Sequence, residues 1–135
     1  IMYKNLFNGE TFDVVTKMGV YNGGIIAPGI NLSIKSLAEF ADQLPVFLMK
    51  KPKKVVGKNT IEALRSGFYW GYSGLINNII LKITKKTKMK YKIIFTGGYA
   101  SLFKTSIATP FTVDKNITIE GITEIYKKNF ENLTK

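Results

Sequence analysis

The chain has 135 residues and is 45% hydrophobic, which is enough to bury the core of one ordinary domain. It contains no cysteine and no histidine, so disulfides, thiolate zinc sites and Ser-His-Asp catalysis are excluded, and acid–base chemistry would fall to carboxylates, lysines or tyrosines. The formal net charge of +11 comes almost wholly from lysine, whereas sequence-specific readers of nucleic acid use arginine forks and interleaved aromatics, so a nucleic-acid partner is not expected.

A β-hairpin is the first element that the sequence predicts. Residues 11–16 alternate around β-branched side chains, as in a half-buried strand. Met18-Gly19 and Asn22-Gly23 are turn-forming pairs, so we expect two short strands joined by a tight turn within residues 11–27. Asp13 lies on the first strand, where its carboxylate could coordinate a cation, act on a substrate or simply occupy the surface.

A helix is expected after this hairpin. From Ile30 onwards, apolar residues recur at helical spacing until Pro45, which would stop the run. Residues 46–49 and 55–56 are then typical of short extended pieces on either side of a lysine-rich turn.

The strongest local signal is a long helix that begins at Asn59 and is expected to end near Lys85. Asn59 and Glu62 form a capping box at its start. The apolar face that we expect to be buried consists of Ile61, Leu64, Phe68, Tyr72, Leu75, Ile79 and Ile83. An adjacent face carries small residues, namely Ala63, Gly67, Gly71 and Gly74. Glycine lowers helix propensity, so this face indicates close packing by another backbone, for which a second subunit is one candidate.

One more strand and two more helices are expected in the rest of the chain. Tyr91 to Phe95 is typical of a buried parallel strand, and a helix around residues 101–106 would follow it. Residues 113–117 could add a brief strand or a loop. A closing helix from Thr118 would turn five side chains inward, namely Ile122, Ile125, Tyr126, Phe130 and Leu133. This alternation of strands and helices favours a single mixed α/β domain.

Glycine-containing turns stand at three joints between the expected strands and helices. They are Gly23 to Gly29, Gly57 to Thr60, and Thr96 to Ala100. Such turns let the backbone approach a ligand and aim free N–H groups at negative charge, so their order indicates a site for a phosphorylated ligand. Gly97 and Gly98 could lie beneath an adenosine or could form only a tight connection. Thr60 could hold an anionic oxygen or merely assist the helix cap.

The sequence shows no sign of a membrane or exported protein. Ile1 to Phe12 mixes polar and apolar residues, unlike a signal peptide. No apolar run approaches the roughly 18 residues that a membrane span requires. We therefore expect a cytoplasmic location and no membrane partner.

Five segments, taken together in their order and spacing, resemble the C-terminal half of type III pantothenate kinases. They are Thr11-Phe12-Asp13-Val14-Val15, Gly23-Gly24-Ile25-Ile26-Ala27-Pro28-Gly29, Gly57-Lys58-Asn59-Thr60-Ile61-Glu62-Ala63, Ser66-Gly67 with Gly71-Tyr72-Ser73-Gly74, and Thr96-Gly97-Gly98-Tyr99-Ala100. The match covers nearly the whole chain after Glu10, and residues 119–129 resemble the last helix of that family.

The resemblance implies the ribonuclease-H-like, actin-like ATPase fold, a mixed sheet flanked by helices, with residues 1–135 as the second of two similar domains. It also implies a cytoplasmic homodimer that transfers the γ-phosphoryl group of ATP to pantothenate. The product would be 4′-phosphopantothenate, and the reaction would be the first step of coenzyme A biosynthesis. The cofactors would be Mg²⁺ and a monovalent cation, K⁺ or NH₄⁺. Thr60 matches the family's pantothenate-contacting threonine, and Gly97 and Gly98 match the turn beside the nucleotide.

Two departures from that family pattern concern the chemistry. Residues 5–10 replace an Asp-Phe-Gly-Thr-Ala-Thr-like stretch, so the cation-binding aspartate and the ATP-contacting threonine are both missing. The family's phosphate loop and catalytic aspartate lie upstream of Ile1, so we expect a fragment that is inactive alone and assign no catalytic or metal-binding residue. A non-catalytic binding or regulatory module of the same fold is the alternative. A third possibility is a lysine-driven nucleic-acid-binding domain, whose affinity would depend strongly on salt.

Overall fold

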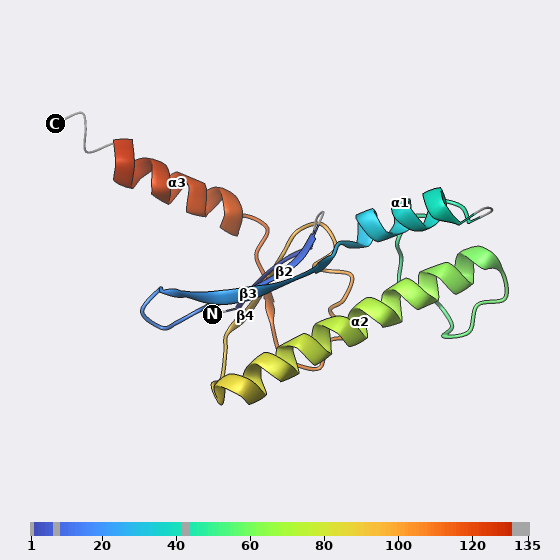
Figure 1. Ribbon diagram of the computed structural model, residues 1–135, viewed down its shortest axis with the longest axis horizontal. Helices are drawn as coiled ribbons and strands as arrows, with labels where there is room; N and C mark the ends of the chain where they lie inside the picture. The colour runs from blue at the N-terminus through green and yellow to red at the C-terminus, as the bar shows by residue number, and fades with distance from the viewer. Residues whose placement is uncertain (1, 7–8, 42–43, 131–135) are drawn as a thin grey trace.

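A computed structural model describes residues 2–6, 9–41 and 44–130 of the chain. The strands are β1 (Met2–Leu6), β2 (Gly9–Val15), β3 (Tyr21–Pro28), β4 (Ile93–Thr96) and β5 (Thr112–Val113). The helices are α1 (Ile30–Phe40), α2 (Thr60–Thr87) and α3 (Ile117–Phe130). Figure 1 shows the long α2 running beside the sheet, α1 near the N-terminal end of α2, and α3 projecting away on the opposite side of the molecule. None of the described helices combines the length and apolar character that crossing a bilayer requires.

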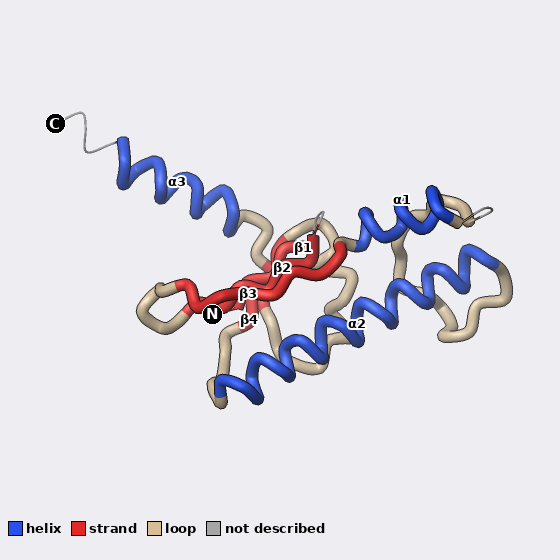
Figure 2. Tube along the Cα trace, in the orientation of Figure 1, coloured by secondary structure: helices blue, strands red, loops and turns tan. Residues whose placement is uncertain are grey.

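The five strands form one mixed sheet in the order β3-β2-β1-β4-β5, which lies at the centre of the molecule (Figure 2). β2 is antiparallel to both β1 and β3, whereas β4 is parallel to both β1 and β5. The predicted hairpin within residues 11–27 is therefore confirmed as β2 and β3. The central strand β1 was not predicted, because its sequence lacks a clear alternation and its place is fixed by backbone pairing with β2 and β4.

The core lies between the sheet and α2. Side chains alternate along β2 so that Glu10, Phe12 and Val14 are buried, while all four residues of β4 are buried, as predicted for this strand. The C-terminal half of α2 packs on these strands through Ile76, Ile80 and Ile83. Farther towards its N-terminus, Tyr69 stacks on Phe103, with ring centroids 5.5 Å apart.

The long helix is confirmed, and its start is capped as expected. The side chain of Asn59 accepts a hydrogen bond from the backbone N–H of Glu62 at 2.9 Å. The carboxylate of Glu62 accepts in turn from the backbone N–H of Lys58, one residue before the position that a capping box uses. The helix ends at Thr87, two residues beyond the expected end.

The buried face of α2 differs from the predicted one. The buried residues are Ser66, Tyr69, Ser73, Ile76, Ile80 and Ile83. Of the predicted apolar face only Ile83 is among them, and its other members are half-buried. Serines could replace apolar residues because their hydroxyls are satisfied: Ser73 donates to the carbonyl of Tyr69 at 2.7 Å and Ser66 donates to the carbonyl of Val55.

Several connecting segments also differ from expectation. α1 ends at Phe40 instead of continuing to Pro45. Residues 46–49 and 55–56 form no strand. Residues 101–106 make a series of turns instead of a helix, with bonds such as that from Ser106 N–H to the carbonyl of Phe103. These segments lie against α2, so tertiary contacts determine their conformation more than local propensity does.

The prediction that the closing helix turns its apolar side chains inward is wrong for α3. None of its residues is buried, and Ile122, Ile125, Tyr126 and Phe130 are all more than half exposed. Leu133 lies outside the described residues. The helix begins where expected but leaves the sheet, so none of the described elements covers its apolar face (Figure 1).

Candidate functional site

A groove of about 950 Å³ follows the N-terminal half of α2. Its floor is the half-buried apolar face of the helix together with the small-residue face, and its rim comes from the end of β3, from α1 and from the loop before α2. The lining residues are Pro28, Ser33, Leu44, Gly57, Lys58, Asn59, Thr60, Ala63, Leu64, Gly67, Phe68, Gly71, Tyr72 and Leu75. The groove is therefore mainly apolar and has polar groups at the N-terminus of α2.

Gly57 allows the loop to meet the first turn of α2. A Cβ atom at this position would lie 2.3 Å from the backbone nitrogen of Ala63 and 2.5 Å from the carbonyl carbon of Glu62, so no larger residue fits without moving the backbone. This close approach places Thr60, the first residue of α2, at the rim of the groove with an exposed side chain. Within the described part of the chain, the Thr60 hydroxyl has no hydrogen-bond partner, so it is available to a ligand.

Tyr72 forms the polar part of the groove wall. Its hydroxyl donates to the carbonyl of Pro28 at 3.1 Å. The hydroxyl of Ser33 lies 2.8 Å from the hydroxyl oxygen of Tyr72. Burial raises the pKa of Tyr72 above its usual value, the Ser33 hydrogen bond opposes this change, and the negative charge of Glu10 adds to it. Tyr72 is thus held neutral, as a donor that joins β3, α1 and α2.

The small-residue face of α2 opens into this groove. A Cβ atom added at Gly67, Gly71 or Gly74 would meet no other atom within 4 Å. Packing among the described residues therefore does not require glycine at these positions. The prediction that another backbone packs closely on this face stays a prediction.

The turn formed by Gly97 and Gly98 follows β4 and does not line the groove that contains Thr60. Gly97 has a φ angle of +89°, which favours glycine. The hydroxyl of Tyr99 donates to the side chain of Asn31 at 2.7 Å, which fixes the turn against α1. A Cβ atom at Gly98 would meet open space, so a ligand could approach the backbone there.

Asp13 belongs to a third part of the structure. A cavity of about 490 Å³ lies between the sheet and α3. Thr11, Asp13 and Thr96 line it on the side of the sheet, and five residues of α3 line the other side, namely Ile117, Thr118, Glu120, Gly121 and Glu124. Within the described ranges, no cluster of three or more carboxylate, histidine or cysteine side chains could hold a metal ion.

Sequence reasoning missed Glu10 and Ser33 as parts of the site. Glu10 is completely buried, and its charge acts on Tyr72. The alternation along β2 was the available signal, because Glu10 shares the inward register of Phe12 and Val14. Ser33 carried no comparable signal, since its role depends on α1 lying beside α2.

Comparison with known families and proteins gives consistent matches. The family model for type III pantothenate kinase matches residues 10–82, which is more than half of the chain. The chain is 54% identical over 112 residues to a type III pantothenate kinase of Pelagibacter ubique and 42% identical over 119 residues to one of Phenylobacterium zucineum. These alignments cover 83% and 88% of this chain but 45% and 46% of the relatives, so the chain spans less than half of their length.

Among solved structures, a conserved Campylobacter jejuni protein, proposed to be a Baf family transcriptional activator, has a similar fold. The TM-score is 0.62, and the match covers 95% of this chain and 57% of that protein. Sequence identity is 21%, so this likeness concerns the fold alone.

Proposed function

Because the chain belongs to the type III pantothenate kinase family, we propose that it acts as the C-terminal half of a cytoplasmic kinase that phosphorylates pantothenate with ATP. The product is 4′-phosphopantothenate, which opens coenzyme A biosynthesis. The chain alone is inactive, since it supplies one wall of the cleft and the rest of the catalytic apparatus lies in the other half.

The fold that we propose is the ribonuclease-H-like domain of the actin-like ATPases. The strand order β3-β2-β1-β4-β5, with an antiparallel β1-β2-β3 unit and β4 and β5 parallel to β1, supports this assignment. The crossover from β3 to β4 through α1 and α2 supports it further.

Thr60 is the residue to which we assign pantothenate binding, and its position is the observation on which the proposal most depends. Its exposed hydroxyl stands at the rim of an apolar groove, beside the backbone N–H groups of the first turn of α2. A hydroxyl and free N–H groups suit the polar and carboxylate oxygens of a small acid, and the apolar floor suits its aliphatic part.

Gly97 and Gly98 are assigned to the nucleotide. The open space above Gly98 and the positive φ of Gly97 support a close approach by ATP at the end of β4. Among the described residues, no group of three or more carboxylate side chains could hold a metal ion, and we assign Mg²⁺ and the monovalent cation, K⁺ or NH₄⁺, to no residue here. No catalytic base is assigned either.

A homodimer completes the site in this proposal. The groove along α2 is wide and apolar, and the glycines at 67 and 71 leave room for a second helix. A second copy packed there would cover the apolar floor and close the groove above Thr60.

Steady-state kinetics of the full-length kinase that contains this chain test the role of Thr60. Thr60→Ala should raise the KM for pantothenate at least tenfold and leave the KM for ATP unchanged, whereas Thr60→Ser should restore most of the affinity. Thr123→Ala, at an exposed threonine of α3 that lines none of the three cavities, is the control and should change neither value. An unchanged KM for pantothenate in Thr60→Ala would refute the assignment.

A non-catalytic binding or regulatory module is the second candidate, and Glu10 favours it. Residues 5–10 depart from the kinase pattern, and the Glu10 side chain is completely buried, so it cannot replace a hydroxyl that touches ATP. Calorimetry with pantothenate and ATP distinguishes the two candidates. If the full-length protein binds pantothenate and ATP but forms no 4′-phosphopantothenate, the result supports the non-catalytic module. Formation of 4′-phosphopantothenate would exclude the module.

A further inference from the structure

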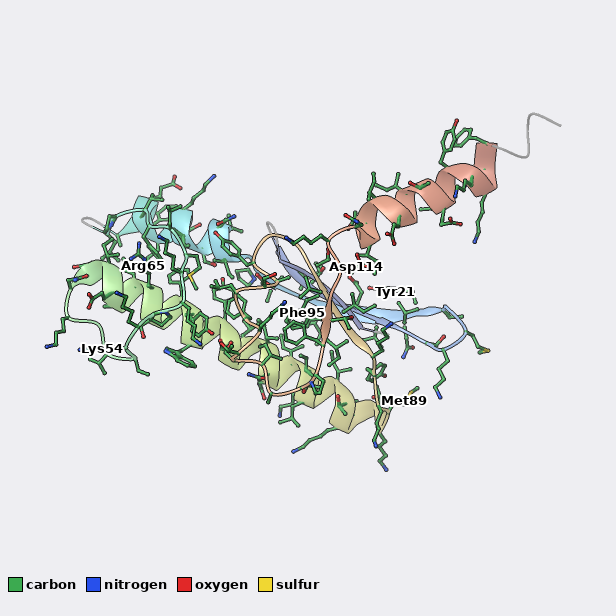
Figure 3. All side chains as sticks on the ribbon, turned by 180° about the vertical axis from the view of Figure 1, so that it is seen from behind. Tyr21, Lys54, Arg65, Met89, Phe95 and Asp114 are labelled. Atoms are coloured by element: carbon green, nitrogen blue, oxygen red, sulfur yellow. The ribbon has the colours of Figure 1, made fainter. Side chains whose placement is uncertain are left out.

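A second cavity lies on the lysine-rich loop that precedes α2. It has a volume of about 500 Å³, and most of the residues that line it are cationic. The cations are Lys50, Lys51, Lys53, Lys54, Lys58 and Arg65. Figure 3 shows Lys54 and Arg65 at the same end of the molecule, where α2 begins. Neither the pantothenate role of Thr60 nor the nucleotide role of Gly97 uses this cavity.

The loop that carries these lysines is tied to α2 at both ends. Arg65 Nε donates to the carbonyl of Leu48 at 3.1 Å, and the hydroxyl of Ser66 donates to the carbonyl of Val55. Lys51 Nζ also donates to the hydroxyl of Thr105 at 2.7 Å. The cationic side chains therefore project from a fixed backbone, which lowers the entropy lost when they bind a common ligand.

The positive charge of the cavity is not neutralised within the described chain. Glu62 is the one carboxylate in the lining, and its Oε2 accepts from the backbone N–H of Lys58 at 2.9 Å. Among the described residues, the ion pair that the structure contains joins Lys127 and Glu124 on α3, far along the sequence. Like charges held around one concave space repel one another, so an anion that enters relieves this repulsion.

We propose that this cavity binds a compact anion with two or more linked phosphate groups, either an inorganic polyphosphate or a nucleotide. Its volume lies within the roughly 300–1,000 Å³ typical of small-molecule sites. The chain's single arginine lines this cavity together with lysines that supply further charge, a combination suited to phosphate oxygens. No aromatic side chain lines the cavity, so a stacked single strand of nucleic acid is disfavoured.

Lys58 connects this site to the candidate substrate groove, since it lines both cavities. An anion bound at the lysine loop therefore lies next to the first turn of α2. The cavity is separate from the turn at Gly97 and Gly98 that we assign to ATP, so it would bind the anion whether or not the chain belongs to an active kinase.

Calorimetric titration of the intact protein with inorganic triphosphate at about 0.15 M salt, where distant charges are screened, tests the proposal. The variant Lys53→Glu with Lys54→Glu should weaken triphosphate binding at least tenfold. Its control, Lys85→Glu with Lys86→Glu, changes the net charge equally at the far end of α2 and should weaken binding less than twofold. Both pairs are exposed, and an unchanged melting temperature without ligand shows that each variant is folded.

Three results would overturn the proposal. They are no binding of triphosphate at millimolar concentration, equal weakening by the two pairs of substitutions, and a single-stranded oligonucleotide that displaces triphosphate and binds more tightly. Single inorganic phosphate should bind much more weakly than triphosphate. Guanosine triphosphate then distinguishes the sources: tighter binding than triphosphate identifies a nucleotide, and equal binding identifies the bare polyphosphate.

Discussion

The hydroxyl oxygens of Ser33 and Tyr72 lie 2.8 Å apart and join α1 to the middle of α2. Tyr72 has one O–H, which it donates to the carbonyl of Pro28, so the shared proton in the contact with Ser33 comes from the serine. This direction agrees with the effect of Ser33, which lowers the pKa of Tyr72 against the rise caused by burial. The pair fixes one wall of the groove that Thr60 borders.

Tyr72→Phe should destabilise the fold by about 1–2 kcal/mol, because it removes two hydrogen bonds and leaves the Pro28 carbonyl without its donor. The control is Tyr126→Phe on α3, where the exposed hydroxyl has no partner among the described residues. Urea unfolding measures both values. Equal stability of the two variants would show that the Ser33 and Pro28 contacts contribute nothing.

The same variant gives a prediction for alkaline pH. The folded pKa of Tyr72 is raised above the ordinary value of 10.0, so folding favours the neutral side chain. Its contribution to stability is therefore complete below pH 10 and is lost as the pH rises through the folded pKa. The difference in unfolding free energy between wild type and Tyr72→Phe should shrink above pH 10. A constant difference would contradict the raised pKa.

Gly57→Ala should cost about 1–3 kcal/mol, because the new methyl group overlaps the backbone of Glu62 and Ala63. The matched substitution is Gly98→Ala, whose methyl group meets open space and should change stability by less than about 0.5 kcal/mol. Thermal unfolding separates the two. If both variants melted like wild type, the loop before α2 would be free to move away from the helix.

Asn59→Ala should cost about 1 kcal/mol, since its side chain accepts the N–H of Glu62 at the start of α2. Thr60→Ala, one residue later, leaves this cap intact and should change stability little. The stability of Thr60→Ala is also a control for the kinetic test of Thr60. If this variant is as stable as the wild type, a loss of pantothenate affinity cannot be ascribed to a damaged helix. A larger loss for Thr60→Ala than for Asn59→Ala would reverse these roles.

Elements with a local cause were predictable from the sequence. The cap at Asn59 and the alternation along β2 depend on residues a few positions apart, and both were confirmed. β1 was missed because its strand is made by neighbours on both sides. The buried face of α2 had no local signal, since the contact of the Ser73 hydroxyl with that of Ser106, 2.8 Å away, joins residues far apart in the sequence.

In the candidate site, too, features with a local cause were predictable from the sequence and contacts between elements were not. The turns at Gly57 and Gly97 and the residue Thr60 were found from the sequence, but the structure places them in two regions, the groove along α2 and the turn after β4. The turn expected from Gly23 onwards is wrong, because residues 23–28 belong to strand β3. Glu10 and Ser33 escaped notice because their contacts cross between elements. Apolar spacing alone predicted burial for α3, yet burial also needs a covering element, and none of the described ones reaches it.

Substitution of Gly71 tests the proposed dimer, because the sign of the change in stability depends on whether a second helix packs on this residue. In a single chain, Gly71→Ala fills open space and removes a glycine from a helix interior, so it should stabilise by about 0.5–1 kcal/mol. Gly121→Ala in α3, also a helical glycine in open space, is the control and should stabilise equally in either case.

If a second helix packs on the small-residue face, added side chains at Gly71 collide with it. Gly71→Ala should then lose its advantage, and Gly71→Leu should convert the dimer to a monomer in sedimentation experiments while Gly121→Leu does not. The stability of the wild type should also rise with protein concentration, because the dimer is favoured by mass action. A wild type that sediments as a monomer, with Gly71→Ala as stabilising as Gly121→Ala, would rule out this interface.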